Sequence, residues 1–343
     1  MSTSETHRAT PTPKTRRLHR LLLLVALAAT VAIPFLLGGA NTLSAAAHIP
    51  AAGYAGLLAL IVTSWVARAL KLHQLLHRLQ TPASFRRAFG ISLATDLAFA
   101  ATPAGVGGYV ASIYYLRQAG TSGSGAATIT AMDQGIDLVF FALAVPLAAL
   151  ALAGSGLSQA MTLTALGGAA LTSGFLIALW FGRRRVVSLL ATPNAWSARW
   201  PRVAKAQHSL RGFVASMAAH VASIVEAGPR FLIRMLALTA LQWLSRYAVL
   251  WLTLLLLGHA VSFALAFLLQ VVVLHAALWT GIPAGGGGAE LGLTATLAPW
   301  IAPGEMATAL IVWRAATLYT SLLAGSVAIV LLARRSRRNI APG

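Results

Sequence analysis

The sequence contains no cysteine and very few acidic residues. Among 343 residues there are 7 Asp and Glu against 26 Lys and Arg, and charged residues make up only 10% of the chain. The absence of cysteine excludes a disulfide framework and thiol chemistry. The low charge, in a chain that is 58% hydrophobic, excludes a soluble globular domain and indicates an integral membrane protein.

Motifs for metal-dependent catalysis are also missing. The sequence has neither a His-Glu zinc motif nor a paired-aspartate metal motif. Gly-Ser-Gly occurs twice, at residues 123–125 and 154–156, but both copies fall in predicted loops. We therefore expect a protein that is not an enzyme and that uses no cofactor and no metal.

The net charge of +19 would suit a nucleic-acid partner, but its placement favours a membrane. Basic residues gather in the two tails and in the gaps between apolar runs, as expected of cytoplasmic flanks that face anionic lipid. Arg68, Lys71, Arg78, Arg86 and Arg87 form one such predicted cytoplasmic patch. We expect anionic lipid head groups, and not nucleic acid, to be the partners of this charge.

Six apolar stretches are long enough to cross a bilayer as helices, since about 20 residues cover its hydrocarbon core. They are residues 21–38, 51–67, 126–153, 163–181, 231–257 and 307–332. A signal peptide cleaved near residue 47 is the alternative for the first of them. The connector 183–230 has apolar residues at helical spacing with basic residues between them. It predicts an amphipathic helix that lies on the inner membrane surface or packs on the membrane domain.

Two further apolar stretches are interrupted by similar glycine-rich segments. The first is Thr102-Pro-Ala-Gly-Val-Gly-Gly108, and Pro-Ala-Gly recurs 180 residues later in the second, between Trp279 and Glu290. A helix in lipid cannot carry such a run unless other protein groups satisfy the freed backbone. Broken segments at matching places in two halves predict a substrate site, the alternative being two loops between ordinary spans. The candidate substrate-binding residues in the two breaks are Pro103, Gly105, Gly107, Gly108, Pro283, Gly285 and Gly287.

Arginine placement gives the expected topology. By the positive-inside rule the first hairpin enters from the cytoplasm and the second from the outside, because no Lys or Arg lies between Arg246 and Arg314. The halves 51–182 and 231–333 are then inverted repeats, a transporter design. We expect an all-α polytopic protein of the cell (plasma or inner) membrane. It would have six transmembrane helices and two re-entrant hairpins in a single domain, 21–333, and cytoplasmic basic tails at 1–20 and 334–343.

Several charged residues lie within apolar runs, where a charge at the bilayer centre costs about 2.5–3.5 kcal/mol by insertion scales. They are Asp96, Asp133, Asp137, Glu290, Arg246 and Arg314. We expect a polar cavity between the halves where Asp133, Asp137 and Glu290 meet Arg314, with Arg246 nearby. Arg117, which follows the first hairpin, completes the candidate substrate-binding residues.

Arg314 can hold a lipid phosphate through two parallel hydrogen bonds, and free amides after the glycine runs can also bind an anion. A structural ion pair between helices is the alternative. His275, before the second break, is either a proton carrier or a hydrogen-bonded interior residue.

These motifs resemble the transmembrane region of lysylphosphatidylglycerol synthases and related flippase-like membrane proteins, over roughly residues 21–332. The similar segments are Pro103–Gly108, Tyr114–Gly120, Asp133–Asp137, Pro283–Glu290 and the following Arg314. The resemblance implies a lipid flippase fold of two inverted halves, in which charged residues beside the breaks serve the lipid head group. On that pattern Glu290 and Arg314 carry over directly.

Two positions depart from the family pattern, and they leave the choice of head group open. Tyr109 stands where the pattern has an acidic residue, and Gln134 stands where it has an arginine. The aminoacyl-transferring domain of the synthases is not in this sequence, so we expect that the chain alone does not make aminoacylated lipid.

The sequence thus favours a transporter that moves a phospholipid or another lipid-linked amphiphile between leaflets, with membrane lipids as its partners. Two alternatives stay open. One is an ion-coupled secondary transporter of a small polar solute. The other is a non-catalytic membrane subunit of a separate lipid-modifying enzyme, and a homo-oligomer is also compatible with the sequence.

Overall fold

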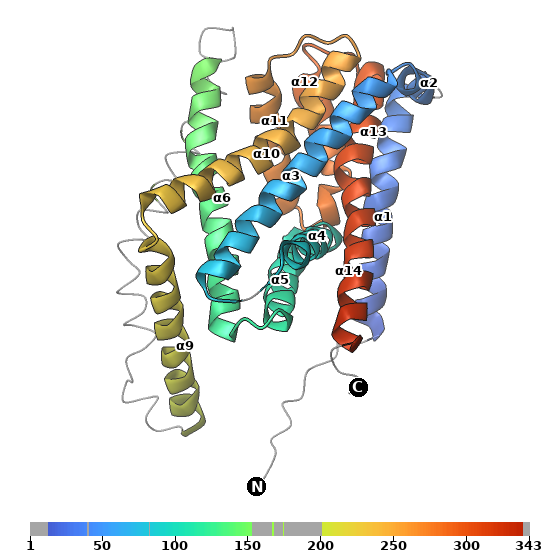
Figure 1. Cartoon of the computed structure of the whole chain (residues 1–343). Helices are drawn as coiled ribbons and strands as arrows, with labels where there is room; N and C mark the ends of the chain where they lie inside the picture. The colour runs from blue at the N-terminus through green and yellow to red at the C-terminus, as the bar shows by residue number, and fades with distance from the viewer. Residues whose placement is uncertain are drawn as a thin grey trace.

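The computed structural model describes residues 13–152, except Ala40 and Pro82, and residues 201–338, together with the single positions 167 and 174. All regular structure in these residues is helical, which confirms the all-α fold (Figure 1). The predicted span 163–181 falls outside the described residues apart from positions 167 and 174. So do the outer parts of both tails and the connector before residue 201.

The first helices form one side of the bundle. They are α1 (Pro13–Gly38), the short α2 (Asn41–Ala47) and α3 (Ala51–Arg78). The predicted span over 51–67 was too short, because α3 continues for eleven residues beyond Ala67. Arg68 and Lys71 therefore belong to the helix bundle and not to a cytoplasmic patch, and the Lys71 side chain is 0% exposed.

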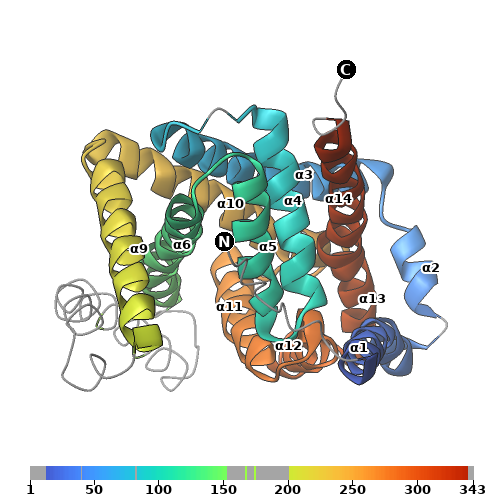
Figure 2. The ribbon, with the colours of Figure 1, turned by 90° about the horizontal axis from the view of Figure 1, so that it is seen from below.

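The first glycine-rich segment forms a broken hairpin. It consists of α4 (Phe85–Ala101), the short 3-10 turn η1 (Pro103–Gly105) and α5 (Val106–Gln118). α4 and α5 pack side by side (Figure 2). Ser84 caps the start of α4 by accepting a hydrogen bond from the backbone N–H of Arg87 at 3.3 Å.

Three long helices follow in the described chain: α6 (Gly123–Ala151), α9 (Pro201–Val225) and α10 (Pro229–Leu256). α9 packs along α6, and the hydroxyls of Ser124 and Ser216 lie 2.8 Å apart between them. The helix predicted in the connector is therefore present and is packed on the membrane domain, one of the two arrangements expected for it.

The second broken hairpin consists of α11 (Phe263–Trp279), the 3-10 turn η2 (Pro283–Gly285) and α12 (Gly288–Leu297). It lies in the upper part of Figure 1, whereas the first hairpin lies in the lower part. The chain ends with α13 (Pro303–Arg314), a π turn η3 (Ala315–Tyr319) and α14 (Thr320–Arg338). The start of α1 and the end of α14 lie at the same end of the bundle (Figure 1).

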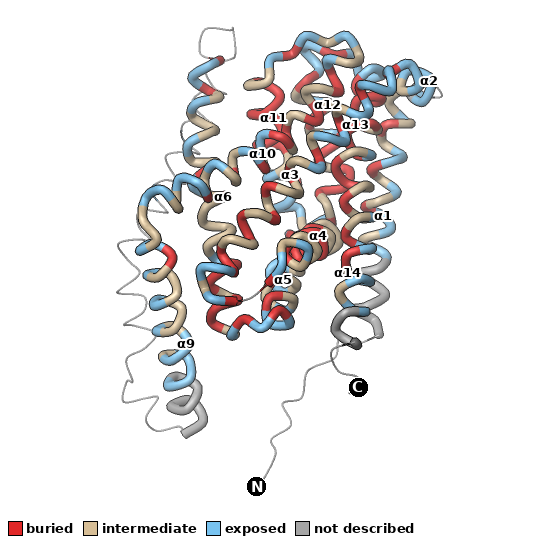
Figure 3. The backbone as a smooth tube through the Cα atoms, in the orientation of Figure 1, coloured by how far each residue is buried: buried red, intermediate tan, exposed pale blue. Residues whose placement is uncertain are grey.

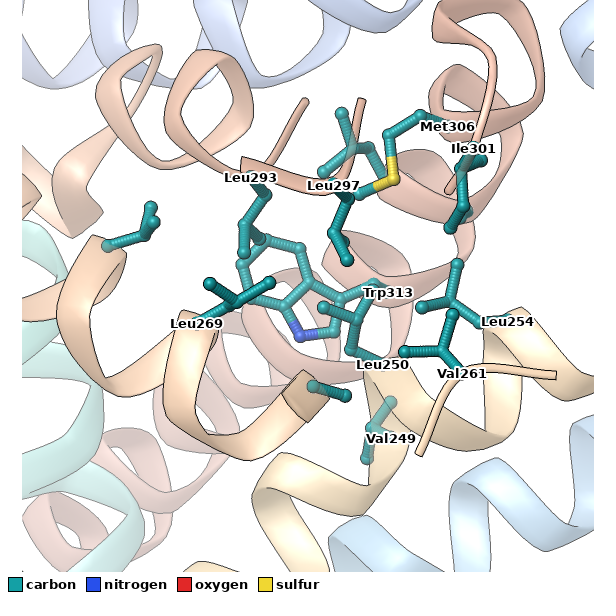
Figure 4. Close-up of a cluster of buried hydrophobic side chains, with 14 of the residues drawn as sticks. Val249, Leu250, Leu254, Val261, Leu269, Leu293, Leu297, Ile301, Met306 and Trp313 are labelled. Carbon is teal, nitrogen blue, oxygen red and sulfur yellow. The ribbon is translucent and has the colours of Figure 1, made fainter. Parts of the chain in front are cut away.

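Four stretches within the described residues are long and apolar enough to cross a membrane: Ala51–Arg78, Gly123–Ala151, Pro229–Leu256 and Pro303–Arg334. α1 contributes a shorter apolar segment, Leu23–Gly38. Buried residues fill the middle of the bundle (Figure 3), and the largest buried cluster surrounds Trp313 between α10, α11, α12 and α13 (Figure 4). Large apolar side chains also face outward, such as Leu36 at 84% and Trp279 at 88% exposure, as suits a surface covered by lipid.

Candidate functional site

The two breaks share the backbone conformation of their Pro-Ala-Gly turns and differ after them, where Val106 is helical and Gly286 is extended (φ −57°, ψ 131°). Ala104 (φ 50°, ψ 18°) and Ala284 (φ 54°, ψ 12°) both adopt the left-handed region that non-glycine residues rarely enter. Each is followed by a glycine with positive φ, Gly105 and Gly285. Sequence segments 180 residues apart therefore make the same turn, which reverses the direction of the chain.

The two turns meet inside the bundle. η1 packs against η2, and each turn also contacts the first helix of the other hairpin: α4 contacts η2, and α11 contacts η1. α12 has only 10 residues, and at about 1.5 Å per residue it is too short to cross a ~30 Å hydrocarbon core. These are hairpins with touching tips, and not loops between ordinary spans.

Side chains close to the first break satisfy its backbone and fill its space. The Thr102 hydroxyl accepts a hydrogen bond from the N–H of Gly107 at 2.9 Å and donates one to the carbonyl of Ala98 at 2.7 Å. The Phe99 ring packs so closely that a Cβ added to Gly108 would lie 2.2 Å from its Cγ. Gly108 is therefore required by the close approach of the Phe99 ring.

A buried ion pair organises the second break. Glu290 is 0% exposed, and its Oε1 accepts a hydrogen bond from Arg314 Nε at 2.5 Å. Its Oε2 accepts a hydrogen bond from the N–H of Gly287 at 2.8 Å, so the carboxylate closes the start of α12. Arg314 also donates from Nη1 to the carbonyl of Ala284 at 3.4 Å and stacks on Trp313 with its Cζ 4.6 Å from the ring centre.

The remaining terminal nitrogen of Arg314 is uncommitted. Nη2 is buried and has no hydrogen-bond partner among the residues that the structure describes. It therefore leaves one donor beside the break that can meet an anion.

α1 lies against this break from the outside. A Cβ added to Gly286 would lie 2.6 Å from the carbonyl oxygen of Ala26, so only glycine fits there. On the same helix, the Thr30 hydroxyl lies 2.5 Å from the Tyr319 hydroxyl in the π turn. α1 is thus an integral part of the packing at the site.

A second, larger ion network joins four helices. Lys71 Nζ of α3 lies 2.5 Å from Oδ1 of Asp137 and 2.8 Å from Oδ1 of Asp133, both on α6. Arg68 of α3 pairs with Asp96 of α4 and also lies 3.5 Å from Oδ2 of Asp133. Arg246 of α10 lies 3.5 Å from Oδ2 of Asp96. Three cations and three carboxylates thus meet at the contact of α3 with α4, α6 and α10.

The observed ion pairs differ from the single polar cavity that the sequence predicted. Of the charges predicted to converge, Glu290 and Arg314 do meet, but Asp133 and Asp137 pair with Lys71 and not with Arg314. The reason is that α6 turns its acidic face toward α3. The sequence carried a signal for this, since Arg68 and Lys71 are three residues apart and Asp133 and Asp137 four apart, so each pair shares one helix face.

The network reaches the first break through an aromatic ring. The Arg68 guanidinium lies 5.8 Å from the centre of the Phe99 ring, which in turn packs on Gly105 and Gly108. Each break therefore has an arginine–carboxylate pair close by: the partly buried Arg68 with Asp96 at the first, and the buried Arg314 with Glu290 at the second.

Two predicted residues stand apart from the breaks. Arg117 is exposed in the last turn of α5, at the opposite end of that helix from the break. His275 has its Nδ1 2.7 Å from the carbonyl of Val271, which agrees with the hydrogen-bonded interpretation of this residue. No group of three or more His, Cys, Asp or Glu in the described ranges is placed to hold a metal ion.

Fold and site together define a polytopic all-α membrane protein built around two broken hairpins whose tips touch. The family described as the lysylphosphatidylglycerol synthase TM region matches residues 22–325. This chain belongs to that family, which confirms the resemblance noted in its motifs. A search of curated proteins finds no match to the chain.

Proposed function

We propose that this protein moves a phospholipid or another lipid-linked amphiphile between the two leaflets of the cell membrane, as a carrier and not as an enzyme. The contact between the two breaks carries the proposal. Two Pro-Ala-Gly turns of similar conformation, 180 residues apart, touch inside the bundle, and each has an arginine–carboxylate pair beside it. Broken helices that meet in this way are a recurrent substrate site of membrane transporters.

The arrangement of the hairpins supports alternating access. They lie toward opposite ends of the bundle (Figure 1), as two inverted halves would place them. A pseudo-twofold axis through the touching turns would relate a state open to one leaflet to a state open to the other. Rocking of one half against the other would then carry a head group past the turns while its acyl chains stay in lipid.

The chemistry near the second break suits a phosphate-bearing head group. Arg314 is held in place by Glu290 and Trp313 and keeps Nη2 uncommitted. With Nε held by Glu290, the guanidinium can offer a phosphate Nη2 together with the second N–H of Nη1, a planar pair of donors that a lysine ammonium cannot form. In this proposal Arg314 receives the lipid phosphate and Glu290 keeps the arginine paired when the site is empty.

The charge distribution supports a cytoplasmic location for both chain termini. Arg78, Arg86 and Arg117 are exposed at the ends of α3, α4 and α5, on the side of the bundle where α1 starts and α14 ends. Basic residues collect on the cytoplasmic side of membrane proteins and attract anionic lipid there. We place the protein in the plasma or inner membrane, with lipids as its partners.

Reconstitution into vesicles that contain head-group-labelled lipids tests the proposal. We expect the purified protein to expose inner-leaflet label to a membrane-impermeant reductant, and Arg314→Lys to lose most of this activity. Arg334→Lys, an exposed position on α14, is the matched control and should behave like the wild type. Uptake of a soluble solute without lipid movement would overturn the proposal.

The family name favours one further candidate, a membrane subunit that serves a lipid-modifying enzyme encoded separately. In that case the purified protein alone moves no lipid, and co-purification with such an enzyme restores movement. The same vesicle assay, performed with and without the enzyme, separates the two functions.

A further inference from the structure

The Lys71 cluster, made of Lys71, Asp133 and Asp137, contains one more carboxylate than cation. Within it Lys71 Nζ lies 2.5 Å from one aspartate and 2.8 Å from the other. Arg68, the nearest additional cation, is engaged with Asp96, and Arg246 reaches only Asp96. The fully buried Lys71 is thus shared by both aspartates, and Arg68, the second cation at this site, lies within 3.5 Å of Asp133.

The two carboxylates are not equally compensated. Asp133 receives Lys71, Arg68 at 3.5 Å and the side-chain amide of Gln134 at 3.3 Å. Asp137 has one charged partner among the described residues, Lys71. Two carboxylates that share a site disfavour double ionisation, and a proton settles on the less compensated one. In this cluster that residue is Asp137.

The other helices packed on α6 do not supply Asp137 with a second charged partner in the described structure. On α11 the ring of His275 contacts Phe141, one turn from Asp137, and on α10 the ring of Tyr247 contacts Phe141 as well. α5 contributes an uncharged hydroxyl at 2.8 Å, from Ser112 to Thr130. On α9, His220 lies beside Gly125, at the far end of α6.

We propose that Asp137, beside Lys71 and Asp133, is a proton-binding site, and that exchange of its proton couples lipid movement to a proton gradient. The coupling half of this statement rests on the proposed function. Asp137 takes a proton from water as a carboxylic acid and returns the same proton to water as a carboxylate, while Lys71 stays an ammonium throughout. The Asp137 side chain keeps 12% exposure, against 0% for Lys71, so exchange takes place at the aspartate.

Protonation would change how α6 is tied to the first hairpin. With Asp137 neutral, Lys71 pairs with Asp133 alone, and Arg68 is released to Asp96 on α4. With Asp137 ionised, Lys71 is shared and Asp133 needs the contribution of Arg68. Binding of the proton would therefore weaken the Arg68 bridge between Asp133 of α6 and Asp96 of α4, the helix that leads into the first break.

A proton suits this cluster better than a metal cation does. A sodium ion would sit against an ammonium that already occupies the position between the carboxylates, and like charges repel at this distance. The same geometry accepts a proton without displacing any group.

Infrared spectroscopy of the full chain in lipid nanodiscs tests proton binding without any transport assay. We expect the carbonyl stretch of a buried carboxylic acid at neutral pH, its loss on alkalinisation and its absence in Asp137→Asn. Glu226→Gln, on an exposed residue, should leave the band unchanged. In Asp133→Asn, Lys71 serves Asp137 alone, so the band should disappear at lower pH than in the wild type.

No pH-dependent acid band in the wild type, or a band that persists in Asp137→Asn, would overturn the proton site. If Asp137→Asn does not fold, the direction of the Asp133→Asn shift decides instead. A shift to higher pH, or no shift, counts against the proposal.

Vesicles with an imposed gradient test the coupling. One pH unit should shift the steady-state distribution of labelled lipid by about tenfold if one proton accompanies each lipid, and Asp137→Asn should remove this response. Lipid movement that ignores the pH gradient, or follows a sodium gradient, would refute the coupling and leave the proposed function intact. If no lipid moves at all, the proposed function fails, and the infrared band still decides whether Asp137 binds a proton.

Discussion

Arg314 has one carboxylate partner in the described structure, and Glu290 divides its two oxygens between that arginine and the backbone of Gly287. Neither side chain is more than 5% exposed. A buried charge left without its partner is strongly destabilising, because neither water nor another ion replaces the lost interaction. The pair is thus a structural requirement of the second break as well as the proposed lipid site.

We expect Glu290→Ala to lower the free energy of unfolding by about 3–5 kcal/mol, since it leaves the Arg314 guanidinium buried and uncompensated. Thermal unfolding in detergent measures the loss. Glu305→Ala is the control, because Glu305 is 60% exposed and only 3.6 Å from His259, and an exposed pair contributes about 0–1 kcal/mol. Equal destabilisation by the two variants would contradict the assignment of Glu290 as a buried structural charge.

At the scale of elements, the glycine-rich breaks were predictable and the end of α3 was not. Proline with several glycines in an apolar run cannot continue a helix in lipid, so both hairpins follow from the sequence alone. Arg68 and Lys71 looked like the end of a span because their partners, Asp96 and Asp133, are remote in the chain. Local composition could not show that α3 continues, since only tertiary packing supplies the compensating carboxylates.

The hairpin turn depends on the fit between Phe99 and Gly108, which a single methyl group should disturb. Gly108→Ala places a Cβ into the Phe99 ring, and we expect a loss of about 1–3 kcal/mol from overpacking. Phe99→Leu in the same chain should restore part of it, because the smaller side chain makes room. Gly212→Ala on α9, where a new Cβ meets nothing within 4 Å, should not destabilise the protein.

A double-mutant cycle on Phe99 and Gly108 measures this coupling. Strictly additive effects of the two substitutions would show that the ring and the glycine are not packed against each other in the folded protein.

For the whole molecule, the sequence predicted the all-α fold, and most of its spans fall on described helices. It also placed Glu290 beside Arg314, because a charge in an apolar run needs a partner nearby. What it did not predict is the division of the charges into two sets, since the rotation of α6 toward α3 is decided by packing among helices that are distant in the chain. The inverted topology remains a prediction from arginine placement.

The absence of native cysteine makes that topology directly testable. A single cysteine at Gln118, where α5 ends, should react with a membrane-impermeant thiol reagent only from the cytoplasmic side. A cysteine at Trp300, beyond α12, should react only from the outside, as should the control Glu305→Cys. Reaction of the Gln118 and Trp300 positions from the same side would exclude inverted hairpins.

Helix α1 packs on the second break, and this makes the surroundings of the two breaks different. The Ala26 carbonyl of α1 packs closely on Gly286, and the Thr30 hydroxyl contacts the Tyr319 hydroxyl. These two contacts restrain the second break. The elements packed on the first turn, η1, are α4, α5, α11 and η2, all of them parts of the hairpins themselves. Because α1 restrains the second break, we expect the second hairpin to be the less mobile of the two, with slower hydrogen exchange of its backbone amides.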